Sequence, residues 1–329
     1  MISKEQLNLA VVPGGSMGQA IALIAAQKGH NVRVYRRAHE VDTRERVNLP
    51  DNVKIFSSLK DTVTGVDVLV LAPPTQIFEE LARESLFYLK RESLILSASK
   101  GLQKGTNHRP SQILENLDQT LRPRIAVMSG PNLASGILRG DETGTVIAAY
   151  NSKVANYLRD RLENPKFIIQ AEKDLIGVEL GGAFKNLVAL AAGMFDEINM
   201  SANTKAYYIT KLVSELVEVA LRQGAKSSTF TGLSWLGDIF LCTTDNESRN
   251  YRAGELLVKN PRAAQGFLSE DKPWLAEGVH TIAPAYALAR VSNINSTPIL
   301  DLINNAVYTE QSLEDAINRL GNNRDYHDS

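Results

Sequence analysis

One lysine in an apolar stretch is the first candidate for chemistry in this sequence. Lys185 comes two residues after the small segment Gly181-Gly182-Ala183, and apart from Asn186 the residues after it are apolar as far as Phe195. Burial disfavours the charged form of lysine, which lowers its pKa toward the range useful for proton transfer. We therefore expect Lys185 to act as a general acid or base, the alternative being a solvated lysine on an amphipathic helix.

A phosphate-binding pattern lies further along the chain. Ser248-Arg249-Asn250 precedes a helix that we expect to begin near Tyr251. N–H groups at a helix start and a guanidinium together form a site for a phosphate. Upstream of this segment, Asp238 can orient a lysine or a substrate hydroxyl. The alternative for Ser248-Arg249-Asn250 is an ordinary helix cap.

A glycine loop near the start of the chain predicts a dinucleotide site. The segment Val11-Val12-Pro13-Gly14-Gly15-Ser16-Met17-Gly18 lies between an expected strand and an expected helix. It occupies the place of the G-x-G-x-x-G fingerprint, in which glycines let a pyrophosphate approach backbone N–H groups. Gly15 and Gly18 keep the second and third glycines, and Pro13 replaces the first. A plain strand–helix turn is the alternative.

The next expected strand ends with two arginines. After Tyr35-Arg36-Arg37 no acidic residue occurs until Glu40. A carboxylate at this point favours the ribose hydroxyl of NAD, whereas an arginine favours the 2′-phosphate of NADP. The pattern predicts a preference for NADP, unless the two arginines are merely a solvated pair on a surface loop.

Two further expected strands end in residues suited to ligand binding. These ends are Ser99-Lys100-Gly101 and Ser129-Gly130-Pro131-Asn132. Ligands of open α/β sheets bind at the carboxyl ends of strands, where a lysine offers a cation to a carbonyl oxygen or a phosphate. The alternative for Lys100 is a turn lysine beside a glycine.

The elements that must position these residues alternate between strand and helix in the first half of the chain. Expected strands are 9–12, 32–35, 53–56, 68–72, 94–97, 125–128, 145–149 and 167–169. This alternation predicts a Rossmann-like, doubly wound parallel sheet. From about residue 172 helical periodicity dominates, with helices expected over 176–195, 204–223, 250–258 and 284–290. We expect a dinucleotide-binding domain over 1–171 and a mostly helical substrate domain over 172–329.

Composition excludes several classes of protein. The 329 residues carry 36 basic and 37 acidic side chains, which argues against a nucleic-acid partner or an anionic membrane surface. One cysteine, Cys242, rules out an intrachain disulfide and fits a reducing compartment. The five histidines show no metal-ligand spacing, and no apolar run approaches a bilayer's width. We expect a cytoplasmic enzyme without a metal site.

In order and spacing, several motifs resemble the bacterial type of NAD(P)-dependent sn-glycerol-3-phosphate dehydrogenase from about residue 9 to 320. The resemblance is tightest in the second half and is supported by Lys100-Gly101-Leu102 and Ser129-Gly130-Pro131. The second-half motifs are Gly177–Asn186, Asn203-Thr204-Lys205-Ala206, Leu236-Gly237-Asp238, Ser248-Arg249-Asn250 and Ala276-Glu277-Gly278.

This resemblance implies a role for each matching residue. Lys185 exchanges the proton with the substrate C2 oxygen, with Lys100 and Asp238 beside it; the charge of Asp238 would oppose the effect of burial on the lysine pKa. The matching substrate contacts are Asn186, Ser248, Arg249 and Asn250. The matching cofactor contacts are Gly15, Ser16, Met17, Gly18, Arg36, Lys100, Gly130, Ala134, Arg249 and Glu277.

The sequence departs from the family pattern at five places. Pro13 replaces a fingerprint glycine, Met17 an aromatic residue and Gly136 a glutamate. Asp141-Glu142-Thr143-Gly144 stands in place of Leu-Pro-Thr-Ala, and Cys242-Thr243 in place of Thr-Cys. The first three changes affect the cofactor site, and the last affects the substrate pocket.

The resemblance and the residues together predict an oxidoreductase that interconverts dihydroxyacetone phosphate and sn-glycerol 3-phosphate. NADPH is the preferred cofactor and NADH a possible one. The family further implies a homodimer that supplies glycerophospholipid synthesis. The alternatives are a β-hydroxyacid dehydrogenase-like enzyme, whose substrate carries a carboxylate, and a non-catalytic NADP(H)-binding protein.

Overall fold

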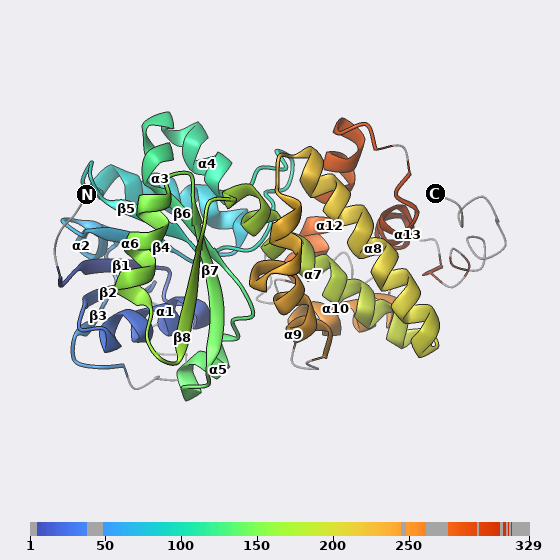
Figure 1. The fold of residues 1–329 in the computed structure, drawn as a ribbon, viewed down its shortest axis with the longest axis horizontal. Helices are drawn as coiled ribbons and strands as arrows, with labels where there is room; N and C mark the ends of the chain where they lie inside the picture. The colour runs from blue at the N-terminus through green and yellow to red at the C-terminus, as the bar shows by residue number, and fades with distance from the viewer. Residues whose placement is uncertain are drawn as a thin grey trace. The chain divides into compact units, whose positions relative to one another are not determined.

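A computed structural model describes residues 5–37, 49–244, 248–260, 276–294 and 296–309, together with 312, 313, 315 and 317. The chain divides into two compact units (Figure 1). The first unit comprises Met1–Lys100 and Arg109–Glu179, and the second comprises Gly101–His108 and Leu180–Ser329. The division into functional domains after residue 171 stays a prediction.

The first unit is built on one eight-stranded sheet, in the order β3-β2-β1-β4-β5-β6-β7-β8. The strands are β1 (Asn8–Val12), β2 (Asn31–Tyr35), β3 (Val53–Phe56), β4 (Val68–Leu71), β5 (Leu94–Ser97), β6 (Ile125–Ser129), β7 (Thr143–Ala149) and β8 (Phe167–Glu172). All four residues of β4 are buried, as expected for an apolar strand covered on both faces. The predicted Rossmann-like class is confirmed.

Helices cover both faces of this sheet (Figure 1). One layer contains α1 (Ser16–Gln27), α5 (Ala134–Arg139) and α6 (Ser152–Leu162), and the other contains α2 (Leu59–Val63), α3 (Phe78–Tyr88) and α4 (Pro110–Leu117). The apolar sides of α1 and α6 pack with the inner strands into one core.

One strand pair departs from the predicted parallel sheet. β7 runs antiparallel to β6, while the other neighbouring pairs are parallel. Only the six-residue helix α5 lies between them, and the chain turns back directly after Ser129. Asn132 Nδ2 donates to the Gly144 carbonyl at 3.0 Å and Thr143 Oγ1 to that of Pro131 at 2.7 Å, so the start of β7 is held beside the end of β6. The chain therefore enters β7 at the carboxyl end of β6. A parallel pair would require it to cross back to the end of the sheet where the other strands begin.

The second unit is helical. Its helices are the main part of α7 (Leu175–Glu197), then α8 (Ala202–Arg222), α9 (Asp238–Thr244), α10 (Arg249–Lys259), α12 (Glu277–Val291) and α13 (Pro298–Tyr308). The helix expected over 284–290 begins earlier, at Glu277, and continues through Pro284. Proline removes one backbone hydrogen bond, but Val279 and Ile282 are fully buried, so packing holds this first half helical.

Helix α7 is the core of the second unit. Its 23 residues are long and apolar enough to cross a membrane, yet 94% of its most apolar window is buried inside the protein. A Cβ at Gly193 of α7 would lie 2.0 Å from the Tyr251 carbonyl oxygen, and one at Gly254 of α10 would lie 2.1 Å from that of Leu190. These glycines let α7 and α10 approach at backbone distance, which sets the position of the α10 start.

A carboxylate of α8 caps α13. Glu215 Oε1 accepts the Ile299 N–H at 3.0 Å, and Oε2 accepts the Leu300 N–H at 2.8 Å. Burial raises the pKa of Glu215 to about 7, although these two donors and Lys211 oppose the shift. Because that pKa lies above the ordinary 4.5, the folded chain binds this proton more tightly than the unfolded chain between the two values.

We expect the stabilisation linked to this proton to be present below about pH 4.5 and lost as the pH rises through about 7. Glu215→Gln removes the titration. As the pH rises, the free energy of unfolding of the variant should therefore fall less steeply than that of the wild type, and the two slopes should differ by up to about 1.4 kcal/mol per pH unit. Urea denaturation from about pH 5 to about pH 7 measures both slopes. Glu218→Gln, at an exposed carboxyl of the same helix, is the control. Equal slopes for wild type and Glu215→Gln would contradict this assignment.

Candidate active site

The glycine loop joins the ends of β1 and β2. The Gly14 N–H donates to the Tyr35 carbonyl at 2.7 Å, and a Cβ at Gly14 would lie 2.4 Å from Val34 Cγ1. A Cβ at Gly18 would lie 2.2 Å from the Pro13 carbonyl oxygen. Gly14 and Gly18 are therefore needed for the close approach of loop, strand and helix. Gly14 is not among the predicted cofactor contacts, although its position next to Gly15 in the loop could have indicated its importance.

The start of α1 suits an anion. Gly15 is its N-cap, and no side chain accepts from the first turn. Ser16 is exposed, whereas Met17 packs against the core. The first N–H groups of a helix have no partner within the helix and attract a phosphate. These features fit a dinucleotide pyrophosphate, the group that the fingerprint predicts.

Arg36 is part of this loop rather than of the solvent-facing surface. Arg36 is only 3% exposed, and its Nε donates to the Gly14 carbonyl at 3.3 Å. Arg37, by contrast, is exposed. The alternative of a solvated arginine pair is therefore wrong for Arg36, and a guanidinium lies at the point where the adenosine ribose is expected.

Lys100 and Gly130 meet at the carboxyl edge of the sheet. Lys100 Nζ donates to the Gly130 carbonyl at 2.8 Å, which joins the segments after β5 and β6. A Cβ at Gly130 would lie 2.8 Å from Thr145 Cα, so β7 requires glycine here. Ala134 is the first residue of α5, and no side chain caps that helix start. The structure thus brings together the predicted residues Lys100 and Gly130.

Lys185 lies in α7 against two side chains of α9. Its Nζ is 3.0 Å from Asp238 Oδ1 and 2.9 Å from Cys242 Sγ, and all three residues are buried. Burial alone lowers the pKa of Lys185, but Asp238 and Cys242 together raise it above its ordinary value. The expected fall of this pKa is therefore wrong, because the buried partners outweigh desolvation. Lys185 is an ammonium at neutral pH, which suits a proton donor.

Two predicted substrate residues bond to each other. Asn250 Nδ2 donates to Asn186 Oδ1 at 2.9 Å, and Asn250 Oδ1 accepts the Gly278 N–H at 2.9 Å. A Cβ at Gly278 would lie 2.5 Å from the Asn186 carbonyl oxygen. Asn250 therefore ties α7, α10 and α12 together beside Lys185, a structural role that its family match alone does not indicate.

Helix α10 begins at Arg249, within two residues of the expected start. Ser248 is its N-cap and accepts the Tyr251 N–H at 3.4 Å. Arg249 is exposed in the first turn, where N–H groups and the helix dipole favour an anion. Glu277, a predicted cofactor contact, is the first residue of α12.

A further cluster holds the start of α10 in place. Tyr251 Oη donates to Asp196 Oδ2 of α7, and Lys205 Nζ of α8 donates to the same oxygen at 2.5 Å. Burial and the bond to Asp196 raise the pKa of Tyr251. The sequence contained Lys205 in a motif, but nothing in the spacing indicated Tyr251 and Asp196 as its partners.

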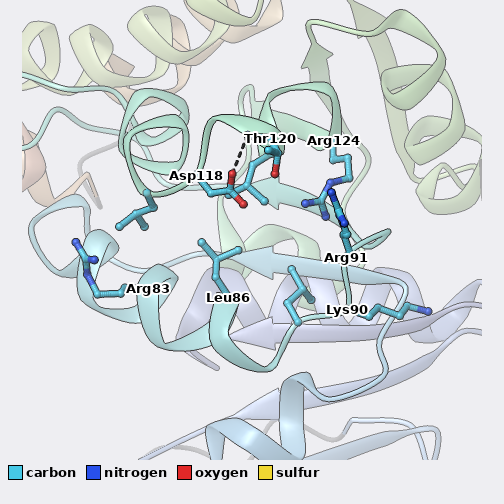
Figure 2. Close-up of a pocket in the computed structure, with 10 residues that line it drawn as sticks. Arg83, Leu86, Lys90, Arg91, Asp118, Thr120 and Arg124 are labelled. Carbon is cyan, nitrogen blue, oxygen red and sulfur yellow. Dashed lines mark hydrogen bonds between the residues drawn. The ribbon is translucent and has the colours of Figure 1, made fainter.

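A pocket of about 480 Å³ lies in the first unit, lined in part by Arg83, Asp118 and Arg124 (Figure 2). Its walls come from segments that precede β5 and β6, whereas the loop follows β1. Two of the cations that line it are engaged with neighbours: Lys90 pairs with Asp67 at 2.7 Å, and Arg124 Nη1 donates to the Ser93 carbonyl at 2.8 Å. The pocket is separate from every predicted site residue. Its lining is Arg83, Leu86, Leu89, Lys90, Arg91, Leu117, Asp118, Thr120, Leu121 and Arg124.

Comparison with known proteins agrees with this arrangement. The chain is 31% identical over 324 residues to glycerol-3-phosphate dehydrogenase (NAD(P)+) of Bacillus cereus, covering 95% of this chain and 94% of that protein. It is 30% identical over 325 residues to the Fusobacterium nucleatum protein of the same name, covering 95% and 96%. The crystal structure of glycerol-3-phosphate dehydrogenase from Coxiella burnetii matches with a TM-score of 0.85 at 28% identity, covering 97% of this chain and 100% of that one.

Family profiles cover both halves of the chain. Residues 8–155 match the NAD-dependent glycerol-3-phosphate dehydrogenase N-terminus, and residues 174–318 match the C-terminus of the same family. The glycine loop falls in the first match and the Lys185–Asp238 pair in the second. The chain therefore belongs to the NAD-dependent glycerol-3-phosphate dehydrogenase family.

Proposed function

We propose that this protein is an NAD(P)-dependent dehydrogenase that interconverts dihydroxyacetone phosphate and sn-glycerol 3-phosphate. The observation that carries the proposal is the buried Lys185–Asp238 pair, at 3.0 Å, in a chain of this family. Reduction of a ketone places negative charge on its oxygen, and an ammonium supplies both a proton and charge stabilisation. In the reverse direction the neutral lysine accepts the proton of the alcohol.

The dinucleotide supplies the hydride when it is bound. Residues 1–171 hold it, with the α1 start and Gly15 toward the pyrophosphate and Arg36 toward the adenosine ribose. Lys100, Gly130 and Ala134 contribute from the carboxyl edge of the sheet. In this proposal Lys100 also acts as a second cation on the substrate oxygen.

Residues 172–329 hold the substrate. Arg249 and Ser248 bind the phosphate at the start of α10, where the helix dipole adds to the guanidinium charge. Asn186 and Asn250 keep that helix start beside Lys185, and Asp238 holds the ammonium. Glu277 contributes to cofactor binding from α12.

Initial rates with dihydroxyacetone phosphate test the proposal, with NADPH and NADH compared in parallel. A 3-oxo acid such as tartronate semialdehyde serves as the second substrate, because a β-hydroxyacid dehydrogenase would prefer a carboxylate near the reacting carbon. Turnover of the phosphate substrate supports the proposal. Dinucleotide binding without turnover of either substrate overturns it in favour of a binding protein.

Cofactor preference gives a separate prediction. We expect a higher kcat/KM with NADPH than with NADH, and Arg36→Asp should reduce or reverse that ratio by roughly tenfold or more, since an arginine–phosphate contact is charge-assisted. Arg37→Asp, at the exposed neighbour, is the matched control for charge. The measurement is kcat/KM with each cofactor for the three proteins. A wild-type preference for NADH would contradict the assignment of Arg36.

We also propose that the protein works in the cytoplasm as a homodimer and supplies glycerol phosphate for phospholipid synthesis. The near balance of charges and the family membership support this setting. Light scattering coupled to gel filtration measures the oligomeric state directly. A monomer at assay concentration would contradict the dimer.

A further inference from the structure

Cys242 lies inside the proposed acid–base centre. It follows Asp238 by one turn of α9, so both side chains are on the same face of that helix. Lys185 Nζ donates to Cys242 Sγ at 2.9 Å, and Cys242 Sγ lies 3.6 Å from Asp238 Oδ1. The cysteine is 5% exposed, so the contact is closed to bulk water.

The charges of this group favour a neutral thiol. The Lys185 ammonium and the Asp238 carboxylate balance each other at 3.0 Å. A thiolate would leave one uncompensated negative charge in a buried place, which is costly. A thiol instead donates its S–H to the carboxylate and accepts from the ammonium. Asp238 and Cys242 are the titratable side chains of α9 in contact with Lys185, and the three groups form one closed triangle.

The triangle fixes the ammonium. A lysine side chain has four rotatable carbon bonds, and a single ion pair leaves it free to swing about its partner. Two acceptors one helical turn apart define its direction. Two of its three N–H donors are thereby engaged, which leaves one for the substrate oxygen.

We propose that Cys242 is a positioning residue, which holds the Lys185 ammonium in the direction that proton transfer requires. This inference rests on the proposed role of Lys185 as the proton donor. Catalysis is sensitive to such placement, because a displacement of about 1 Å can cost roughly 10²-fold in rate. A hydroxyl in place of the thiol can make the same two hydrogen bonds, whereas an apolar side chain can make neither.

Four variants test the role of this thiol. Cys242→Ala and the bulkier Cys242→Val remove the hydrogen bonds, and Cys242→Ser restores them. Thr210→Ala is the control, because the exposed Thr210 hydroxyl of α8 donates to the Ala206 carbonyl of its own helix at 2.8 Å. For alanine and valine we expect kcat to fall by roughly tenfold or more, the worth of one charge-assisted hydrogen bond, with KM nearly unchanged. Cys242→Ser should retain most of the wild-type kcat, and Thr210→Ala all of it.

The thermal midpoint of each variant shows whether it is folded under assay conditions. An equal loss of kcat in the serine, alanine and valine variants, or no loss in any of them, overturns the proposal. Adding Cys242→Ala to Lys185→Ala should lower kcat no further, because the thiol acts through the lysine. If Lys185→Ala itself keeps its activity, the proposed function of Lys185 fails. If that variant loses activity while Cys242→Ala does not, only the positioning role fails.

Discussion

Replacement of Lys185 by alanine is expected to lower kcat for dihydroxyacetone phosphate by roughly 10²–10⁴, the usual contribution of a positioned acid or base. The physical reason is that the oxygen of the reduced carbon then gains its charge without a proton donor in a buried setting. Cofactor binding should survive, because the glycine loop belongs to the other unit of the chain. Steady-state kcat and NADPH affinity by fluorescence measure the two effects.

The alanine variant also needs a folding control. Removing one partner of a buried ion pair costs about 3–5 kcal/mol, because it leaves the other charge uncompensated. In this variant Asp238 loses its ion pair with Lys185. The double variant Lys185→Met/Asp238→Asn removes both charges and should regain stability without regaining activity. Lys185→Ala is expected to lose at least roughly 10²-fold in kcat. If it keeps more than about a tenth of the wild-type kcat, the proton donor lies elsewhere and Lys100 becomes the candidate.

The elements that carry the site were predictable because their patterns are local. The unbroken apolar run of β4 and the loop from Gly14 to Gly18 each depend on neighbours within a few residues. The reversal of β7 was not predictable in this way. It depends on the bonds of Asn132 and Thr143 across the turn, and strand–helix alternation does not specify strand direction.

The surroundings of the candidate residues were harder to predict than their identities. Lys185 and Asp238 stand out in the sequence, but the rise of the lysine pKa depends on how far two buried partners offset desolvation. Arg36 was expected at the ribose, yet its bond to the Gly14 carbonyl needs the folded loop. Gly254 matters because another helix backbone lies against it, which one sequence does not reveal.

Replacement of Arg249 by alanine is expected to raise KM for dihydroxyacetone phosphate by roughly 10–100-fold, the range of a charge-assisted hydrogen bond. Arg249 is exposed in the first turn of α10, so its guanidinium and the helix N–H groups act on the same anion. Ser248 and Asn250 are engaged in holding the helix, as cap and as bridge to Asn186. Among these three side chains, Arg249 is therefore the one whose substitution should weaken phosphate binding most directly.

Unphosphorylated dihydroxyacetone separates this role from a general loss of structure. Its KM should change little in Arg249→Ala, because it has no phosphate to lose. Arg252→Ala is the matched control, since Arg252 is an exposed arginine of the same helix but lies beyond the first turn. Arg249→Lys should recover part of the affinity through charge but not the paired geometry of a guanidinium. An equal loss on both substrates would mean that Arg249 supports the helix start rather than the phosphate, and the phosphate would then depend on the helix N–H groups and Ser248.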